Sequence, residues 1–277
     1  MLKGSNWPRI TVVTPSYNQG QFLEETILSV INQDYPNLEY FIIDGGSTDN
    51  SLEIIKKYED KIDWWVSESD EGQGDAINKG FTRATGELLA WINCDDVYFP
   101  GALRTIGEAY LTQPGASIYV GGIALGSEGN GPINTCHLPC SWPWEANFGL
   151  LRIFQPATFF NREVCNEVGK LRRDLYIRMD GDFIYRLVKA RPKIVNINTL
   201  VAFFRRHSAS KSTTAVQRIL KERQEFLQSL GHPRWKLAMA LCLSRFLRLW
   251  NGVYLKSWLV TRHYRGKYMR EIWAGIK

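Results

Sequence analysis

Short apolar runs alternate with segments of helical periodicity along the first 120 residues of the chain. The runs are rich in β-branched and aromatic side chains, which predicts buried strands at 10–14, 40–43, 62–66, 88–92 and 117–120. The segments between them carry apolar side chains on one helix face, which predicts helices at 21–31, 51–58, 75–85 and 100–111. Strands that alternate with helices in this way predict an α/β fold with a mostly parallel sheet covered by helices.

The pattern changes in the second half of the chain. Residues 121–143 are rich in Gly, Pro, Asn and Cys, which predicts a long connection without regular structure. Regular elements return as an ordered stretch around 154–164, a helix at 182–190 and strands at 194–197 and 200–204. After residue 215 the pattern is helical almost to the end, so we expect one domain at 1–215 and a helical extension at 216–277.

The composition is that of a globular protein with a sizeable core. Hydrophobic residues make up 44% of the 277 residues and charged residues 22%, which excludes a mainly disordered, collagen-like or disulfide-stapled chain. The five cysteines are expected to be reduced thiols. Cys136 and Cys140 lack the second Cys/His pair that a zinc site of this spacing needs, so zinc is the weaker interpretation of that motif.

The charge is divided unequally along the chain. The net charge is +6, but residues 1–233 carry 24 Lys and Arg against 27 Asp and Glu, whereas residues 234–277 carry ten against a single acid, Glu271. Four of the ten tryptophans also lie in this last segment. The basic charge itself therefore belongs to the tail, and the mildly acidic body is interpreted separately from it.

Residues 234–251 predict a basic amphipathic helix. At ~100° per residue Arg234, Arg245 and Arg248 fall within about 60° of one another, among Trp, Leu and Phe side chains. This composition is typical of a helix that lies on an anionic membrane surface. The alternative is a helix that packs its apolar face on the body and leaves its charges in water. No nucleic-acid recognition motif accompanies the basic charge, so no nucleic-acid partner is expected.

The sequence predicts no secretory signal and no membrane span. Residues 1–13 have no apolar core ahead of a small-residue cleavage site. The longest apolar stretch, 237–243, is far shorter than the ~20 residues that cross a bilayer. We therefore expect a cytoplasmic protein that is peripheral on the inner face of the cell membrane.

Acidic side chains lie where several of the predicted strands end. Asp44 ends the second strand, Asp95 and Asp96 follow the fourth, and Asp75 begins a helix. Ligands of parallel sheets bind outside the carboxyl ends of the strands, and adjacent carboxylates there favour a divalent cation, Mg²⁺ or Mn²⁺. For any single Asp, a turn or helix-cap role is the alternative. The chain has no GxxxxGK[ST] and no GxGxxG after its first strand, so phosphate would be met by metal.

Two segments, VTPSYNQGQFLEETILSVINQDYPNLEYFIIDGGSTDNS and SDEGQGDAINKGFTRATGELLAWINCDD, resemble the N-terminal half of family 2 glycosyltransferases. The resemblance is continuous from about residue 9 to 120, with weaker landmarks to about 210. It implies the GT-A fold, a Rossmann-like α/β arrangement, and an inverting enzyme that uses a nucleoside-diphosphate sugar. By this resemblance, Thr14, Pro15, Tyr17 and Asn18 hold the nucleoside, and Asp44 bonds the base, usually uracil.

The resemblance also assigns the sugar and metal sites. Asp75 matches a position near the ribose and the sugar. The DXD element of the family corresponds to Asn93-Cys94-Asp95, in which Asn93 replaces the first acid, and Asp96 follows. Asp95 is then the implied metal ligand, and Asp96 touches the sugar or caps the next helix. His207, in FRRHSAS, is similar to a histidine that reaches back to the metal or the diphosphate.

The acceptor half carries the implied catalytic base. MDGDFIYRL resembles the motif that supplies it, with Met where the family has Glu, so Asp180 is the predicted base and Asp182 the reserve. The alternative is that both acids simply begin a helix. Gln155 resembles the start of the acceptor side, and Trp142 and Trp144 are candidates to stack on a sugar, with local packing as the alternative.

Together these residues predict a metal-dependent inverting glycosyltransferase. It would move a sugar from a UDP-linked donor to a glycan or lipid-linked acceptor in cell-surface polysaccharide assembly. A sugar-phosphate nucleotidyltransferase shares the layout of strands and helices, but would need a Gly- and Arg-rich loop after the first strand, where the chain has TPSYNQG. The remaining alternative is a non-catalytic module that binds nucleotide sugars or membranes.

Overall fold

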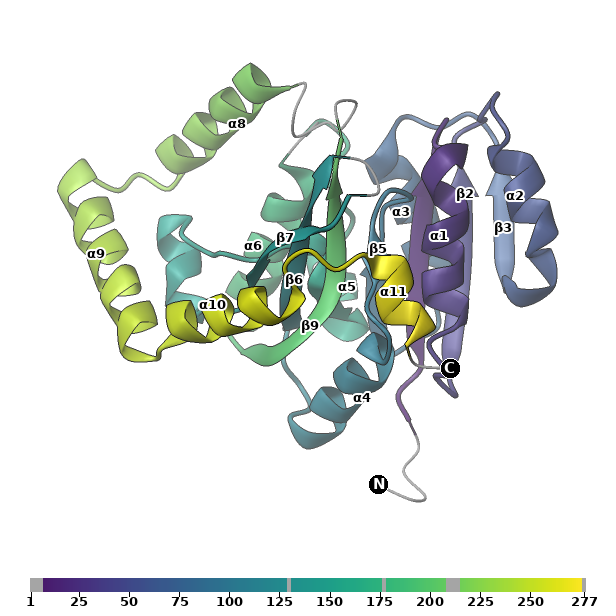
Figure 1. Cartoon of the computed structure of the whole chain (residues 1–277). Helices are drawn as coiled ribbons and strands as arrows, with labels where there is room; N and C mark the ends of the chain where they lie inside the picture. Colours follow the sequence, from purple (N-terminus) through teal and green to yellow (C-terminus); the bar gives the residue numbers. More distant parts are fainter. Residues whose placement is uncertain (1–6, 129–130, 176–177, 208–214, 276–277) are drawn as a thin grey trace.

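A computed structural model describes residues 7–128, 131–175, 178–207 and 215–275. Its centre is one nine-stranded sheet with the order β3-β2-β1-β4-β8-β6-β9-β5 and with β7 beside β6 (Figure 1). The strands are β1 (Ile10–Ser16), β2 (Leu38–Asp44), β3 (Trp64–Ser67), β4 (Leu88–Trp91), β5 (Val97–Tyr98), β6 (Ile118–Glu128), β7 (Ile133–His137), β8 (Thr158–Asn161) and β9 (Ile194–Arg206). The α/β class expected from the alternating pattern is confirmed.

Helices cover both faces of the sheet. They are α1 (Gly20–Ile31), α2 (Ser51–Lys57), α3 (Gln73–Arg83), α4 (Ala102–Thr112), α5 (Arg162–Val168) and α6 (Met179–Ala190). Successive strand residues point to opposite faces, so Val12 packs in the core beneath α1, α2 and α4, whereas Val13 packs in the core beneath α3, α5 and α6. Both faces of the central strands are therefore buried, which explains their uninterrupted apolar runs.

The sheet is parallel in its first half and mixed in its second. β3, β2, β1 and β4 are parallel to one another, and β6 is parallel to β9. β8 runs antiparallel to both β4 and β6, and β5 and β7 are antiparallel edge additions. The expected parallel arrangement thus describes the part that carries the strand-end acids, while the acceptor half departs from it.

The prediction of an irregular connection over 121–143 is wrong for 121–128 and for 133–137, which are strands. β6 continues to Glu128 and pairs with both β7 and β9, and its glycines allow the close approach to β9. A methyl group on Gly121 would lie 2.2 Å from Val201 Cγ2, and one on Gly126 would lie 2.3 Å from Phe203 Cζ. The two strands predicted at 194–197 and 200–204 are likewise one continuous strand, β9.

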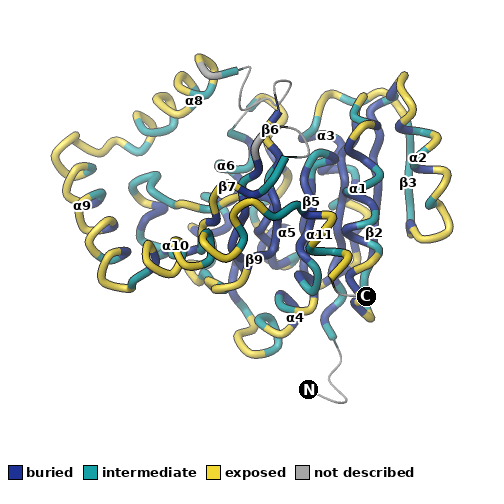
Figure 2. Tube along the Cα trace, viewed as in Figure 1, coloured by how far each residue is buried: buried dark blue, intermediate teal, exposed yellow. Residues whose placement is uncertain are grey.

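The described residues after 215 are mostly helical, as the sequence predicts, and form α8 (Val216–Ser229), α9 (Arg234–Trp250), α10 (Val253–Tyr264) and α11 (Met269–Ala274). α10 and α11 pack on the body. The Thr261 hydroxyl accepts a hydrogen bond from the Cys136 N–H at 2.8 Å, and Met269 belongs to a core cluster with residues of β5, β6, β7 and β9. α8 and α9 lie at the end of the molecule opposite β3 and are largely exposed (Figures 1 and 2). None of the described helices is both long and apolar enough to cross a membrane.

Candidate active site

The candidate site lies where the parallel strands end. Ser16 of β1 is in register with Asp44 of β2, and Asp44 with Ser67 of β3, so these carboxyl ends form one edge of the sheet. β4 ends at Trp91 on the same side, because it is parallel to β1. The segment 93–96 that follows it is therefore next to the turn that follows β1, and the Cys94 thiol lies 2.9 Å from Gln19 Oε1.

The two predicted metal ligands meet at this edge. His207 Nε2 lies 2.9 Å from Asp95 Oδ2, although the residues are 112 positions apart in the chain. His207 follows the end of β9, and its ring packs on the Phe22 ring of α1 at 4.9 Å between centroids. Both side chains are mostly buried, at 7% and 16% exposure, so the pair is held in a defined place.

Asp95 and His207 fit a cation that is shared with a ligand. Within the described residues, no group of three or more His, Cys, Asp or Glu side chains is arranged to hold a metal by itself. One carboxylate and one imidazole leave most positions of a six-coordinate ion to water and to phosphate oxygens, which is the usual arrangement for nucleotide-bound Mg²⁺. Such a donor set could hold a metal that is bound together with a diphosphate.

Asp96 is buried beneath the Asp95 segment. Its side chain is fully buried and accepts hydrogen bonds from the Arg205 backbone N–H and from Asn93 Nδ2, each at 3.2 Å. α4 begins beyond Gly101 without a side-chain cap, so Asp96 does not cap that helix, and its contact with a sugar stays a prediction. Burial, and next the charge of Asp95, raise the pKa of Asp96 well above its ordinary value. Through these two hydrogen bonds the buried Asp96 side chain connects Asn93 to the end of β9.

Helix α1 positions this segment, which the sequence did not reveal. The Thr26 hydroxyl lies 2.9 Å from the carbonyl oxygen of Cys94 and 2.7 Å from that of Asp96. Glu25 forms an ion pair with the buried Arg205, whose guanidinium also lies over the Phe22 ring. A polar Thr on an otherwise apolar helix face was the available signal. Gln73 adds a further contact, since its Nε2 donates to Asn93 Oδ1 at 2.6 Å.

The predicted nucleoside turn is divided between buried and exposed residues. Thr14 and Pro15 are buried in β1, where the Thr14 hydroxyl lies 3.0 Å from the Tyr40 hydroxyl. Tyr17 is 62% exposed and Asn18 has a left-handed backbone with φ of 50°. Asn18 Oδ1 accepts from the Thr48 N–H at 2.8 Å, which connects this turn to the one after β2. The exposed surface of the turn is thus Tyr17 with Asn18.

Asp44 organises the turn after β2. Its carboxylate accepts from the Gly46 and Ser47 N–H groups at 3.1 and 2.8 Å, and from the Ser67 hydroxyl at 2.7 Å. The Ser47 hydroxyl donates to its other oxygen at 2.5 Å. The side chain is fully buried, so these bonds fix the turn that follows β2. Contact of Asp44 with a base stays a prediction.

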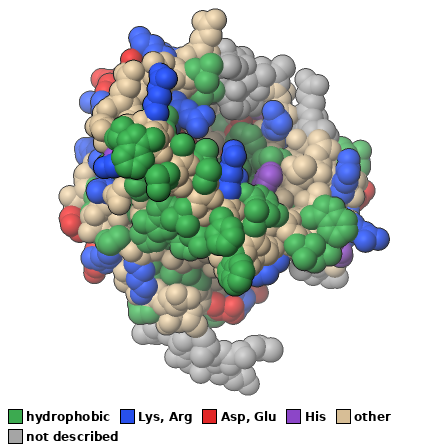
Figure 3. Space-filling model, turned by 90° about the vertical axis from the view of Figure 1, so that its left-hand side faces the viewer, with side chains coloured by type: hydrophobic (Ala, Val, Ile, Leu, Met, Phe, Trp, Pro, Cys, Tyr) green, Lys and Arg blue, Asp and Glu red, His purple; other side chains and the backbone are tan. Residues whose placement is uncertain are grey.

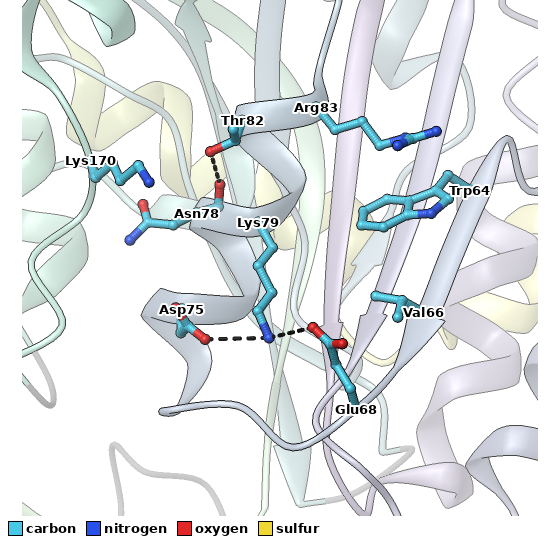
Figure 4. A pocket seen from close by; sticks show the side chains of 9 residues that line it. All are labelled: Trp64, Val66, Glu68, Asp75, Asn78, Lys79, Thr82, Arg83 and Lys170. Carbon is cyan, nitrogen blue, oxygen red and sulfur yellow. Dashed lines mark hydrogen bonds and ion pairs between the residues drawn. The ribbon is translucent and has the colours of Figure 1, made fainter.

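Asp75 lies in the first turn of α3 beside a cavity of about 600 Å³ (Figure 4). Lys79 lies between Asp75 and Glu68, 3.4 Å from the first carboxylate and 2.8 Å from the second, and Arg173 lies 3.1 Å from Asp75. Burial disfavours the ionised form, but the Glu71 N–H and the nearby cations outweigh it and lower the pKa of Asp75. Asp75 is therefore an ionised, cation-bound side chain at the edge of the site.

The structure distinguishes the two candidate bases at the start of α6. Asp182 is in an ion pair with Arg186 at 2.8 Å. Asp180 receives the Gly181 N–H at 2.6 Å, and within the described residues no cation is within ion-pair distance of it. Burial raises the pKa of Asp180, although the Gly181 N–H and Arg178 oppose the rise. α6 adjoins α3 here, since a methyl group on Gly74 would lie 3.3 Å from Met179 Sδ.

The three predicted acceptor-side residues are structural in their contacts. Gln155 is 6% exposed and donates to the Trp91 carbonyl at 2.6 Å, which fastens the end of β4 to its neighbour. Trp142 and Trp144 stack at 6.5 Å between centroids around the 3-10 helix η2 (Pro143–Phe148), and Arg248 of α9 lies over the Trp142 ring. These contacts correspond to the local-packing alternative, and a sugar contact stays a prediction.

The fold and the site define a class: an α/β protein of the GT-A type with an Asp–His pair at the carboxyl ends of its parallel strands. The chain belongs to glycosyl transferase family 2, because the sequence model of that family matches residues 11–189. The resemblance deduced from the sequence motifs is therefore confirmed.

Relatives and solved structures support this assignment. The chain is 39% identical over 109 residues to the uncharacterized glycosyltransferase alr2836 of Nostoc sp. and 32% identical over 146 residues to the putative teichuronic acid biosynthesis glycosyltransferase TuaG of Bacillus subtilis. These segments cover 38% and 51% of this chain, and 34% and 58% of the relatives. The chain thus matches only part of each relative's length.

Two solved structures share the fold. S. aureus TarS 1-349 in complex with UDP-GlcNAc is similar with a TM-score of 0.57 at 19% identity, over 78% of this chain and 66% of that one. The mannosyltransferase PcManGT from Pyrobaculum calidifontis, in complex with GDP-Man and Mn²⁺, has a TM-score of 0.56 at 16% identity, over 92% and 85%. At these identities the similarity concerns the fold.

Proposed function

We propose that this protein is a metal-dependent, inverting glycosyltransferase that moves a sugar from a UDP-linked donor to a glycan or lipid-linked acceptor in cell-surface polysaccharide assembly. The observation that carries the proposal is the contact of Asp95 with His207 at 2.9 Å, at the strand edge where α/β proteins bind nucleotides, in a chain of this family. The similarity to TuaG, a putative teichuronic acid biosynthesis glycosyltransferase, supports the polysaccharide setting.

Donor binding is proposed to use the exposed surface of the turn after β1. Tyr17 offers an aromatic face to a nucleoside base, and Asn18 fixes the turn through its bond to the Thr48 N–H. Asp44 keeps the turn after β2 in place through its bonds to residues 46, 47 and 67. Asp75 and its cations border the region in which the sugar would lie.

Asp95 and His207 would hold Mn²⁺ or Mg²⁺ together with the diphosphate. When bound, such a cation neutralises the charge that develops on the leaving diphosphate. The two side chains are largely buried and supported by Phe22 and Thr26, so the chain contributes a fixed pair of ligands and needs little rearrangement to bind.

Asp180 is proposed as the base that takes the proton of the acceptor hydroxyl. A carboxylate with a raised pKa is a stronger base than an ordinary Asp, and Asp180 is not engaged by a guanidinium as Asp182 is. With the base on the acceptor side and the leaving group on the other, one in-line displacement inverts the anomeric centre.

The test is a donor screen with Mn²⁺, scoring transfer to an acceptor and release of the nucleoside diphosphate. Asp95→Ala should abolish metal-stimulated release, and Asp180→Asn should retain donor binding while transfer falls by roughly 10²–10⁴-fold. Asp60→Asn, an exposed acid of η1 (Glu59–Lys61), is the matched control and should leave both unchanged. Full transfer by Asp180→Asn, with loss in Asp182→Asn, would contradict the assignment of the base.

The setting of the acceptor is part of the proposal. The basic and aromatic C-terminal helices favour an acceptor presented at the inner face of the cell membrane, because anionic lipid attracts such segments.

A further inference from the structure

Helix α9 packs on the body with its polar side. Its buried residues are Ala240, Ser244 and Arg248, spaced four apart. The Ser244 hydroxyl donates to Glu145 Oε1 at 2.6 Å, Arg248 Nη2 lies 2.5 Å from the same oxygen, and Arg248 Nε donates to the Cys140 carbonyl at 3.1 Å. Neither sequence-based interpretation of this helix anticipated the arrangement, since Arg248 lies inside and not on a basic outer face.

The opposite side of α9 is a stripe of large apolar residues in water. We call it the outward stripe: Trp235, Met239, Leu243, Phe246 and Trp250. At ~100° per residue these side chains fall within about 80° of one another, and each is at least half exposed, Trp250 by 80%. On α10 the exposed apolar side chains are Tyr254, Leu255, Trp258 and Leu259. Figure 3 shows hydrophobic side chains gathered over this end of the molecule, with Lys and Arg among them.

An amphipathic helix normally turns its apolar side to the core, so this inverted orientation needs an explanation. A group of neighbouring large apolar side chains that are exposed on a folded protein marks a binding surface for a protein or a membrane. The buried Glu145–Arg248 pair makes the orientation specific, because a rotation of α9 that hid the stripe would carry Arg248 away and leave the Glu145 carboxylate buried without its counter-charge.

Charge identifies the occupant. From Arg234 to Arg270 the sequence has nine basic residues and no acid. One of the nine, Arg248, is neutralised by its ion pair with Glu145. Lys236 lies over the Trp235 ring and Arg262 over the Trp258 ring, so cations accompany the exposed aromatics. A two-fold contact with a second copy would bring like charges together. An anionic lipid surface instead receives the apolar side chains in its interior and the cations at its headgroups.

We propose that the outward stripe and the exposed apolar residues of α10 form a docking site for a membrane surface that contains anionic phospholipid. α9 lies in the plane of the interface, with its apolar side in the lipid and its polar side on Glu145. The helix η2, which carries Glu145, is thereby kept next to the membrane. This inference rests on the membrane setting of the proposed function and names the surface that would make the contact, and vesicle binding is measured separately from transfer, so either can fail without the other.

Flotation of the full chain with vesicles tests the proposal. With phosphatidylglycerol and phosphatidylcholine in equal parts, the wild type should bind, and the double variant Phe246→Ser/Trp250→Ser should bind on the order of tenfold or more weakly. Both side chains are exposed, so the variant should keep its circular dichroism spectrum and melting temperature. Equal binding by the folded double variant, or no binding by the wild type, would overturn the proposal.

A charge-matched pair tests the lipid class. Lys236→Gln/Arg245→Gln should weaken binding roughly tenfold, whereas Lys56→Gln/Lys61→Gln, at the opposite end of the molecule, should not. Equal binding to vesicles of phosphatidylcholine alone would overturn the anionic part. Sedimentation tests the alternative that a second copy of the chain covers the stripe. If the wild type is a dimer that does not bind vesicles, and Phe246→Ser/Trp250→Ser dissociates it, the stripe is a dimer contact and the lipid site is overturned.

Discussion

Removal of the charge of Glu145 should release α9 from the body at a measurable cost. The carboxylate is fully buried, the Arg248 side chain is 4% exposed, and the two lie 2.5 Å apart. Glu145→Gln preserves the shape and can still accept the Trp142 N–H, which donates to Glu145 Oε2 at 3.1 Å, but it leaves Arg248 without a counter-charge. Loss of one partner of a buried pair costs about 3–5 kcal/mol, so we expect a destabilisation of that order.

The assay is urea-induced unfolding at neutral pH, with limited proteolysis to report on the connection between α8 and α9. The matched control is Glu24→Gln, which breaks the ion pair of Glu24 with Lys57, whose side chains are 43% and 63% exposed. An exposed pair of this kind is worth about 0–1 kcal/mol. The combined change Glu145→Met/Arg248→Met should recover most of the loss, since neither charge is then left alone. If Glu145→Gln costs no more than Glu24→Gln, the account of how α9 is held is wrong.

Other predictions concern the site and the sheet. The pKa of Asp180 is raised, so the acid limb of kcat/KM should lie above the ordinary Asp value of 3.8, and a limb at or below that value would contradict the role of Asp180 as base. The same shift makes stability depend on pH, because the contribution of protonated Asp180 is present at pH below 3.8 and is lost as the pH rises through the folded-state pKa. Asp180→Asn should therefore have a higher melting temperature than the wild type at pH 7 but not at pH 3, as thermal scans can measure. His207→Gln should raise the Mn²⁺ concentration needed for half-maximal activity while leaving the melting temperature of the metal-free protein nearly unchanged, and an unaltered Mn²⁺ dependence would exclude His207 as a ligand. Gly121→Ala should destabilise the protein by about 1–3 kcal/mol, because the new methyl meets Val201 Cγ2 at 2.2 Å, and Val201→Ala should relieve part of that cost in denaturant melts.

The parts of the fold that depend on local pattern could be predicted from the sequence. Apart from the short strand β5, the main strands and helices of the first 120 residues match the alternation of apolar runs and helical faces, because each central strand is buried on both sides. The contact of Asp95 with His207 could be anticipated only through the family resemblance, since nothing local connects residues 112 positions apart. The resemblance to the family had named both Asp95 and His207 as candidate ligands of the metal or the diphosphate.

Other features depend on contacts that a single sequence does not reveal. Gly121 and Gly126 suggest a loop by composition, but they lie in a strand because Val201 and Phe203 occupy the space that side chains would need. The helical period shows that α9 has two sides but not which side is inward. That choice follows from Glu145, which is 103 residues away from Arg248.

Helix α1 also has a mechanical consequence. It begins directly after the exposed turn of Tyr17 and Asn18, and along its length it contacts His207 through Phe22, Arg205 through Glu25 and the Asp95 segment through Thr26. A single rigid helix thus connects the surface proposed for the nucleoside to both members of the Asp–His pair. We therefore expect any displacement of that turn when a base binds to be transmitted along α1 as a rigid-body shift, which couples nucleotide occupancy to cation affinity without a hinge.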